Sequence, residues 1–397
     1  MRKLLENKTV VLGVTGSIAA YKIASLASSL VKKGANVHVI MTQNATNFIN
    51  PITFESLTGR KCLIDTFDRN FEFQVEHVSL AKQADVFMVA PASANVIGKI
   101  AGGIADDMLT TTIMACKAPK IISPAMNTNM FENPIVQDNI QKLKDYGYEV
   151  IDPASGYLAC GDTGAGKMPD PEVLENYIMK AIAKEKDMSG KKVLITAGAT
   201  MEKIDPVRFI SNHSTGKMGY ALAKMAMLRG ADVTLVTGKT NIPKPDFVKI
   251  IEAESAKEMF EAVDDIFESQ DIAIMSAAVA DYRPKTVAEE KIKKKDGESV
   301  IELERTEDIL ATMAARKKNQ IVCGFSMETE NMLENSKAKL EKKNLDMICA
   351  NNLKVAGAGF GTDTNVVTLI TKDSVEELPL MSKEEVAEEI LNRIMLS

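Results

Sequence analysis

Residues 9–41 read TVVLGVTGSIAAYKIASLASSLVKKGANVHVIM and hold the pattern that decides the fold. β-Branched residues dominate 9–14 and 36–41, which predicts two strands. Between them, apolar residues recur at three- and four-residue spacing over 18–34, and the run closes on Gly34. That is the pattern of an amphipathic helix with glycine after its last turn. The stretch therefore predicts two parallel strands joined by a helix.

The same alternation continues along the chain and predicts parallel sheets covered by helices. KKGANVHVIMT (32–42) resembles LRGADVTLVTG (228–238), and ADVFMVAPASAN (84–95) resembles QDIAIMSAAVAD (270–281). We therefore predict an α/β fold class with two tandem Rossmann-like, doubly wound domains. Further strands are expected at 85–90, 120–123, 149–151, 192–196, 232–237, 271–276, 321–326, 346–350 and 365–370, and a second helix at 219–230.

The length of 397 residues also favours two domains, because a single core usually stops growing below that size. The charged stretch AKEKDMSGKK (183–192) is the expected junction. We predict one domain over 1–187 and another over 188–397.

Composition narrows the class of protein. A net charge of −6 gives no electrostatic reason to expect bound nucleic acid. The five cysteines form no C-x-x-C pair, which argues against a disulfide framework or a zinc site and favours a reducing cytoplasm. The amino-terminal apolar run is too short for a signal peptide, and no apolar stretch approaches membrane-spanning length. A cytoplasmic protein with small-molecule partners is expected.

The stretch GDTGAGKM (161–168) superficially matches a phosphate-binding loop. Such a loop needs a hydroxyl after its lysine to hold magnesium, and Met168 stands there instead. Pro169 removes a backbone N–H where a helix start should offer free donors. A glycine-rich flap carrying Cys160 is the better interpretation.

Ligands in open α/β sheets bind beyond the carboxyl ends of the strands. Gly16 and Ser17 follow the first strand and suit an anion, although a capped helix start explains them equally well. The stretch APASAN (90–95) ends the third strand; its small residues leave room for a flat ring, and Ser93 and Asn95 supply polar contacts. His77 and Asn127 remain open between a site role and an ordinary structural role, which for Asn127 is a helix cap.

Taken together, VTGSIAAYK (14–22), His77, PASAN (91–95), PAMNTNMF (124–131) and the flap resemble the flavin-dependent cysteine decarboxylases, specifically the phosphopantothenoylcysteine decarboxylases. The resemblance implies a flavodoxin-like domain that binds FMN. By the same resemblance, His77 is the active-site base, Asn127 holds the substrate carboxylate and Cys160 donates a proton. The FMN-contacting residues implied are Gly16, Ser17, Thr42, Ser93 and Asn95.

The chemistry agrees with a flavin. Decarboxylation leaves two electrons on carbon, and no side chain accepts them, so a cofactor is needed. Oxidation of the substrate thiol to a thioaldehyde provides that acceptor. An ordinary cysteine is mostly a thiol at neutral pH, so Cys160 suits an acid better than a buried apolar role among Gly, Asp and Thr. Two residues depart from the family pattern, Phe131 for Trp and Lys167 for Arg. Lysine is a point charge rather than a bidentate fork, so the contacts that clamp the substrate are expected to differ here.

The second half resembles the phosphopantothenate–cysteine ligases through AGATMEKIDPVRFISNHSTGKMGYALA (197–223), SAAVADYRP (276–284), KIKKK (291–295), GFSMET (324–329) and KAKLEKKNLDMICAN (337–351). The family's usual serine pair is Ser214-Thr215 here, after His213. Ser214 or Thr215 is expected to cap a helix, with Gly216 and Lys217 open to a phosphate; a plain cap is the alternative.

The resemblance implies that CTP, with magnesium, activates phosphopantothenate as an acyl-cytidylate that the amine of cysteine then attacks. Cations must offset the phosphoryl charge, and Lys291 is our choice for the triphosphate. Asn212 is implied in converting the acyl-cytidylate. Lys339 and Lys343 are four residues apart and should share a helix face, for which a solvated face is the alternative. The implied CTP contacts are Ser276, Ala277, Ala278, Asp281, Lys291, Phe325, Lys339 and Lys343; the metal ligands stay unknown.

The sequence thus predicts a bifunctional enzyme of coenzyme A biosynthesis that makes phosphopantothenoylcysteine and decarboxylates it to phosphopantetheine. By resemblance it forms homo-oligomers, with decarboxylase trimers and ligase dimers combining into a dodecamer. One rival is a nicotinamide oxidoreductase, but the chain lacks G-x-G-x-x-G and the acidic ribose ligand. Another is a non-catalytic flavoprotein subunit, which would not require Asn127, Cys160 and the ligase motifs.

Overall fold

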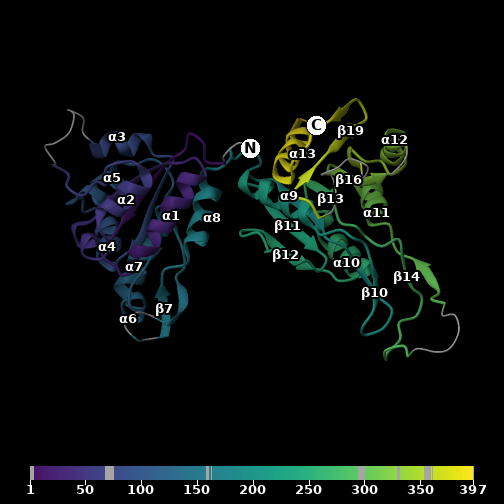
Figure 1. Cartoon of the computed structure of the whole chain (residues 1–397), viewed down its shortest axis with the longest axis horizontal. Coiled ribbons are helices and arrows are strands. Elements are labelled where there is room, and N and C mark those ends of the chain that lie inside the picture. The colour runs from purple at the N-terminus through teal and green to yellow at the C-terminus, as the bar shows by residue number, and fades with distance from the viewer. Residues whose placement is uncertain are drawn as a thin grey trace. The chain divides into compact units, whose positions relative to one another are not determined.

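The computed structural model describes residues 4–67, 76–157, 161, 163–293, 300–328, 331–352, 359 and 361–396. The chain divides into two compact units, Met1–Lys184 and Glu185–Ser397, each built on its own sheet (Figure 1). The division falls inside the charged stretch 183–192. Asp187 belongs to the second unit, where its carboxylate accepts a hydrogen bond of 2.9 Å from Nε of Arg229.

The first unit contains a five-stranded parallel sheet in the order β2-β1-β3-β4-β5. This is the 2-1-3-4-5 order of flavodoxin-like folds, so the predicted fold class is confirmed for this half. A separate antiparallel hairpin, β6 and β7, follows the sheet. The strands are β1 (Thr9–Val14), β2 (Asn36–Met41), β3 (Val86–Ala92), β4 (Lys120–Pro124), β5 (Glu149–Val150), β6 (Ala154–Tyr157) and β7 (Thr163–Lys167).

Helices cover the first sheet because its strands carry apolar side chains on both faces. Every residue of β3 is buried. Four of the helices, α3, α4, α5 and α7, join the strands in one apolar cluster, while α1 and α8 contact each other. The helices are α1 (Ala20–Lys32), α2 (Pro51–Thr58), α3 (Glu76–Gln83), α4 (Ala94–Gly102), α5 (Met108–Ala115), α6 (Thr128–Phe131), α7 (Pro134–Asp145) and α8 (Pro171–Ile182), with a 3-10 turn η1 at Gln43–Asn47.

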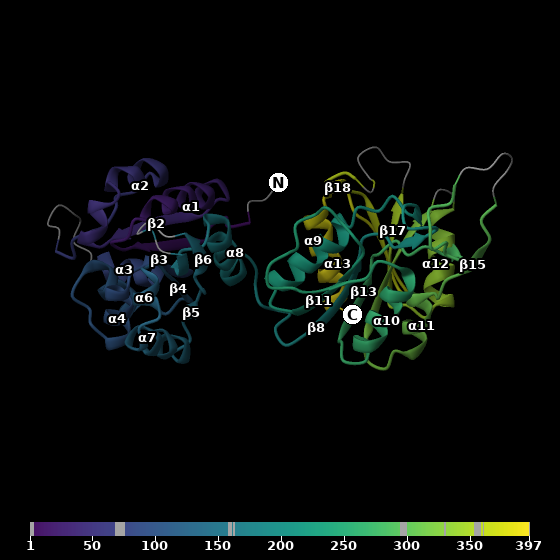
Figure 2. The ribbon, with the colours of Figure 1, turned by 90° about the horizontal axis from the view of Figure 1, so that it is seen from below.

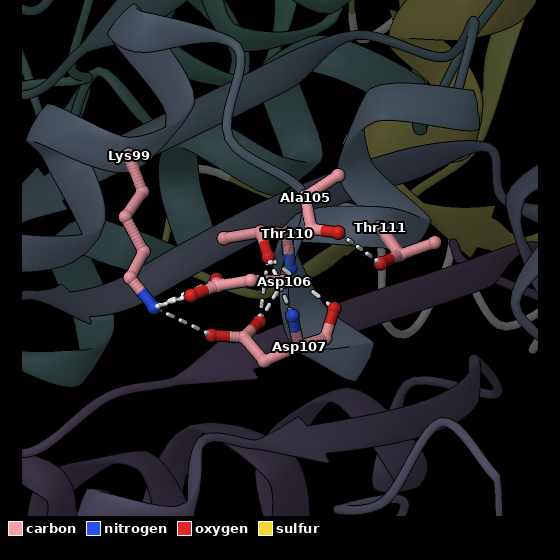
Figure 3. A network of polar contacts seen from close by, with 6 residues as sticks. All are labelled: Lys99, Ala105, Asp106, Asp107, Thr110 and Thr111. Atoms are coloured by element: carbon pink, nitrogen blue, oxygen red, sulfur yellow. Dashed lines mark hydrogen bonds and ion pairs between the residues drawn. The ribbon is translucent and has the colours of Figure 1, made fainter.

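A polar network caps the start of α5 and ties it to α4 (Figure 3). The Asp107 carboxylate accepts from the Thr110 amide at 2.8 Å, and Thr110 Oγ1 accepts from the Asp107 amide at 3.2 Å, which is a reciprocal cap. Lys99 on α4 donates to Asp106 at 2.7 Å and so joins the two helices. Fixed in this way, α5 places Leu109 where a Cβ on Gly13 of β1 would lie only 2.9 Å from Leu109 Cδ1. Gly13 therefore lets α5 pack closely on β1.

The second unit contains an eight-stranded sheet in the order β12-β11-β8-β13-β16-β17-β19-β20. Its first six strands follow the 3-2-1-4-5-6 order of the Rossmann fold, which confirms the predicted class here too. The strands are β8 (Lys192–Ala197), β11 (Asp232–Thr237), β12 (Lys249–Glu252), β13 (Ile272–Met275), β16 (Ile321–Glu328), β17 (Met347–Asn352), β19 (Val367–Thr371) and β20 (Val375–Glu377).

Helices cover both faces of the second sheet. Leu194 of β8 joins α10, α11 and α12 in one apolar cluster, whereas Ala197, on the opposite face, packs against Gly219 of α9. In Figures 1 and 2, α9 and α13 lie side by side, in agreement with their contacts. These helices are α9 (Lys217–Leu228), α10 (Ala256–Phe267), α11 (Ile309–Arg316), α12 (Met332–Lys342) and α13 (Lys383–Leu396).

Several short strands lie outside the predicted pattern. The expectation of parallel sheets is incomplete, because β19 pairs antiparallel with β17 and with β20. Besides the β6–β7 hairpin, periodicity also missed β12, β20 and three further antiparallel pairs, since segments of two to five residues are too short to show alternation. The pairs are β9 (Met201–Lys203) with β10 (Phe209–Ser211), β14 (Tyr282–Pro284) with β15 (Leu303–Arg305), and β18 (Thr364–Asn365) with β21 (Met381–Ser382).

No helix within the described residues combines the length and the apolar character needed to cross a membrane.

Candidate active sites

The first candidate site lies where the strand order of the first sheet reverses, between β1 and β3. Thr15, directly after β1, is buried and donates its hydroxyl to the carbonyl oxygen of Pro91 at 2.7 Å. The same hydroxyl oxygen accepts from the amide of Ser93 at 2.9 Å. These two bonds hold the turn at Gly16 and Ser17 beside the start of α4. The structure thus brings together three of the residues predicted to contact a cofactor, Gly16, Ser17 and Ser93.

In the turn after β1, the Ser17 hydroxyl makes only a long hydrogen bond within the described residues. A Cβ on Gly16 would lie 2.9 Å from Cβ of Asn44, so this close approach needs glycine. Helix α1 begins at Ala20 and its N-cap residue is Ala19, not Ser17. Ser17 Oγ lies 3.4 Å from the Ala19 amide, which is too long for a strong bond. The expectation that Ser17 caps this helix is therefore wrong.

Two hydroxyls at this edge of the sheet lack partners. The Thr42 Oγ1 and Ser123 Oγ atoms are buried and have no hydrogen-bond partner among the described residues. Thr42 follows β2, and its amide donates to the carbonyl oxygen of Val14 at 3.0 Å, so it lies beside the end of β1. A buried hydroxyl without a partner costs free energy, and a bound ligand would remove that cost.

The flap is an antiparallel hairpin seated on the loop that carries Asn127. The Met126 amide donates to the carbonyl oxygen of Gly166 at 3.0 Å. A Cβ on Gly166 would lie 2.4 Å from the Met126 carbonyl oxygen, and one on Gly164 would lie 2.6 Å from Thr128 Oγ1. These glycines therefore serve close backbone packing rather than phosphate binding. Residues 163–167 form strand β7, so a phosphate-binding loop is absent from this described segment.

A cavity of about 450 Å³ lies between the start of α1, the Asn127 loop and the hairpin. Asn127 lines it and also caps α6, accepting from the Asn129 amide at 2.9 Å, so the helix-cap interpretation is confirmed and the site role stays a prediction. Lys22 Nζ donates to the Asp170 carboxylate at 2.8 Å, and this ion pair lowers the pKa of Asp170. The residues that line the cavity include Ser17, Tyr21, Lys22, Met126, Asn127, Tyr157, Lys167 and Met168.

The other residues predicted for this site lie elsewhere. His77 is half-buried on α3 and Asn95 is exposed on α4, and neither lines the cavity. Gly16, Thr42 and Ser93 border the end of β1 without lining the cavity. Cys160 lies outside the described residues.

The second candidate site lies where the order of the second sheet reverses, between β8 and β13. Past the ends of these strands, the Ala278 amide donates to the carbonyl oxygen of Gly198 at 2.8 Å, and the Ala280 amide donates to Thr200 Oγ1 at 2.9 Å. Asn212 Nδ2 donates to the carbonyl oxygen of Ala278 at 3.1 Å. The segment inserted after β8 is therefore fastened to residues 278–280.

A cavity of about 440 Å³ opens at this switch point and collects most of the predicted ligase residues. Three lysines, Lys217, Lys339 and Lys383, line it, and Asp281 is the one acidic group among its described lining residues. This balance favours a polyanionic ligand. The predicted residues in the lining are Asn212, Ser276, Ala277, Ala278, Asp281, Phe325 and Lys339.

Two predicted lysines are not brought to this cavity. Lys343 lies one residue beyond α12, and its Nζ pairs with the Asp308 carboxylate at 2.7 Å. Lys339 and Lys343 were expected to share one helix face, but only Lys339 lines the cavity. Lys291 is exposed, and next to it the Ile292 amide donates to the Asp205 carboxylate at 3.2 Å.

Sequence reasoning missed part of this cavity. Lys383 begins α13, Asn351 lies in β17 and Asn365 ends β18. Asn365 is buried and its amide nitrogen lies 3.3 Å from Asn351 Oδ1. Asn351 is half-buried, and a single sequence does not reveal that these two asparagines meet.

Comparisons with known proteins cover both units. Residues 1–183 match the family described as Flavoprotein, and residues 188–396 match the DNA/pantothenate metabolism flavoprotein C-terminal domain. The chain is 49% identical over 395 residues to a "Coenzyme A biosynthesis bifunctional protein CoaBC" of Bacillus subtilis, covering 98% of this chain and 97% of the relative. The chain belongs to the CoaBC family.

A second curated relative agrees with this membership. A CoaBC protein of Vibrio cholerae is 46% identical over 393 residues, covering 98% of each chain. A crystal structure of the C-terminal domain of a CoaBC protein is 46% identical, with a TM-score of 0.47, and covers 53% of this chain and 97% of that one. The predicted family and the predicted bifunctional role in coenzyme A biosynthesis are confirmed.

Proposed function

We propose that the first unit decarboxylates phosphopantothenoylcysteine with FMN and that the second unit makes this substrate from phosphopantothenate, cysteine and CTP. Membership of the CoaBC family supports the pair of activities. The observation that carries the assignment of each activity to a unit is the match of residues 1–183 to the Flavoprotein family and of residues 188–396 to a different family, the DNA/pantothenate metabolism flavoprotein C-terminal domain. Each unit also has a cavity near the strand ends of its sheet. We accordingly propose that the functional boundary lies near residue 187.

The residues at the first switch point fit a flavin. Donors to a phosphate and a ring system are offered by the Thr42 hydroxyl, which has no partner among the described residues, by the close backbone turn at Gly16 and by the weakly bonded Ser17 hydroxyl. Ser93 and Asn95 complete the set that we propose for FMN. When bound, FMN supplies reversible two-electron chemistry at the substrate thiol, which no side chain can supply.

The chain's own residues then orient the substrate and move protons. Asn127 lies in the cavity wall and is proposed to hold the departing carboxylate by hydrogen bonding. Lys167, from β7 in the same wall, is proposed to attract that carboxylate as a point charge. Cys160 is proposed as the proton donor after CO₂ leaves, and His77 as the base.

The second cavity is proposed to bind CTP and phosphopantothenate. Its lysines offset phosphate charge, and Asp281 can share a magnesium ion with phosphate oxygens. The described residues contain no group of three or more His, Cys, Asp or Glu side chains that could hold a metal alone. Magnesium is therefore proposed to arrive with the nucleotide.

Two residues are proposed for the chemical step. Asn212, held beside Ala278 at the cavity, is proposed to assist conversion of the acyl-cytidylate to the amide. Lys291 is proposed to reach the triphosphate. Asn212 already lies in the wall, whereas Lys291 must approach from an exposed position beside the Asp205 turn.

The assembly is also a proposal. We propose a cytoplasmic homo-oligomer in which decarboxylase trimers and ligase dimers combine into a dodecamer. The predicted decarboxylase residue His77 lies outside the first cavity, as expected if a site were completed by another copy.

Pyrophosphate release tests the function directly. The purified chain is supplied with magnesium, CTP, phosphopantothenate and cysteine, and pyrophosphate is measured. The proposal predicts release that depends on CTP and phosphopantothenate, followed by CO₂ in equal amount when cysteine is present. A chain that releases neither product would be a non-catalytic flavoprotein instead.

A further inference from the structure

One wall of the second cavity is held by two lysines at the starts of neighbouring helices. Lys217 begins α9, and its Nζ donates to the Gly361 carbonyl oxygen at 2.8 Å and to the Asp363 carboxylate at 2.7 Å. Lys383 begins α13, and its Nζ donates to the carbonyl oxygens of Gly359 at 3.0 Å and Thr362 at 2.6 Å. Three backbone carbonyls and one carboxylate thus converge on two ammonium groups.

Further bonds make this wall a defined piece of structure. The Lys383 amide donates to the Asp363 carbonyl oxygen at 2.9 Å, and Thr364 and Asn365 pair with β21 just before α13. Gly359, Asn365 and Lys383 themselves line the cavity. The shape of this side of the cavity therefore depends on where the two ammonium groups hold the chain.

The electrostatic setting of Lys383 is unusual for a lysine. It is 6% exposed, and burial together with the neighbouring Lys217 charge lowers its pKa to about 8, although Asp363 opposes the shift. The remaining acids at the start of α13 have other partners: Glu384 pairs with Lys224, and Glu385 accepts from Ser382. Among the described residues, Lys217 and Asp363 are therefore the charged groups that act on Lys383.

The two lysines and Asp363 carry a net charge of +1, from two ammonium groups and one carboxylate. Hydrogen bonds from charged donors are roughly twice as strong as neutral ones, so the protonated amines hold the carbonyls best. The Lys217 ammonium also lowers the pKa of Asp363, which keeps that carboxylate ionised.

We propose that Lys217 and Lys383 are a positioning pair for the ligase reaction, which fixes Gly359 and residues 361–365 as the wall against which the nucleotide binds. The pair also adds positive charge beside the phosphates. This role rests on the proposed function of the cavity. It differs from the sequence-based expectation for Lys217, which was direct contact with a phosphate.

Binding of CTP with magnesium to the full chain at pH 7.5, measured by calorimetry, tests the pair. Lys383→Met and Lys217→Met should each raise the Kd roughly tenfold or more, because each removes charged hydrogen bonds to the wall. Lys224→Met is the matched control, since it removes a 2.6 Å pair between the same two helices away from the cavity lining. It should change the Kd less than about threefold.

The pH dependence separates this role from a merely structural one. Wild-type affinity for CTP should fall between pH 7.5 and 9.5 as Lys383 loses its proton, while Lys383→Arg should keep its affinity because arginine stays protonated. The phosphate groups of CTP are already ionised in this range. This arm uses no methionine variant, so it decides the matter even if Lys383→Met fails to fold.

The opposing results are equally clear. Wild-type-like binding by Lys383→Met, or equal weakening by Lys224→Met, would overturn the proposal. The proposal would also be overturned if the affinity for CTP changed with pH in the same way in Lys383→Arg as in the wild type. A wild-type chain that binds no CTP at all would contradict the proposed function of the cavity, and the role of the pair with it.

Discussion

The Met126 amide and the Gly166 carbonyl oxygen are joined by a hydrogen bond of 3.0 Å, which seats the glycine-rich hairpin on the loop that carries Asn127. The close packing that accompanies this bond explains why the segment is rich in glycine although it is not a phosphate-binding loop. Gly166 has φ +124° and no room for a Cβ, because the Met126 carbonyl oxygen would lie 2.4 Å away. The hairpin and the Asn127 loop therefore form one wall of the first cavity.

Gly166→Ala should damage the decarboxylase without affecting the ligase. The new methyl group must displace the Met126 carbonyl. The alanine backbone must also keep a left-handed conformation, which alone costs about 1–2 kcal/mol. We expect decarboxylase kcat/KM to fall at least tenfold. Gly103→Ala is the matched control, since Gly103 has φ +73° but nothing within 4 Å of a new Cβ. Equal losses in both variants would show that the contact with Met126 is unimportant.

Thr42→Val should weaken FMN binding while leaving the apoprotein at least as stable. The substitution removes a buried hydroxyl that has no partner among the described residues, so the unliganded protein loses nothing. If that hydroxyl bonds FMN, its loss should raise the Kd of FMN about tenfold. Fluorescence titration of the apoprotein measures this, with Thr46→Val, an exposed hydroxyl bonded to Gln43, as the control. Unchanged FMN affinity would remove Thr42 from the cofactor site.

Cys160→Ala should stall the decarboxylase after CO₂ has left. Loss of a general acid typically costs about 10²- to 10⁴-fold in rate. We expect an oxidised product and a reduced flavin to accumulate, which absorbance and mass spectrometry would detect. Turnover at the wild-type rate would exclude Cys160 as the proton donor.

Lys291→Gln should impair formation of the acyl-cytidylate and spare decarboxylation of supplied phosphopantothenoylcysteine. The two assays on one chain separate a local effect from misfolding, because the units have separate cores. Lys285→Gln, which removes only an exposed pair with Glu302, is the control. Full ligase activity in Lys291→Gln would exclude its proposed role at the triphosphate, and loss of both activities would point to misfolding.

Much of this organisation could be predicted from the sequence. Strands 9–14, 36–41 and 232–237 have the observed bounds, because runs rich in β-branched residues leave few alternatives. The sites at strand ends follow from the same pattern, since parallel strands bring their carboxyl ends to one edge. Lys343 illustrates the limit: helical spacing placed it with Lys339, but α12 ends one residue earlier and Asp308 captures its ammonium group.

The wall held by Lys217 and Lys383 could not be predicted from local patterns. It depends on the contacts of Lys217 with Gly361 and Asp363, which follow it in the sequence by 144 and 146 positions. The pairing of Gly166 with Met126 could not be predicted either, since neither residue type specifies a partner. Local patterns specify elements, whereas tertiary packing decides which side chains reach a cavity.

The most direct test of the central claim is CO₂ release by the purified chain from phosphopantothenoylcysteine, recorded together with its visible absorbance spectrum. The account predicts a yellow protein that releases one FMN per chain on denaturation and evolves CO₂ in proportion to its flavin content. A colourless protein that takes up no FMN on refolding and evolves no CO₂ would contradict it.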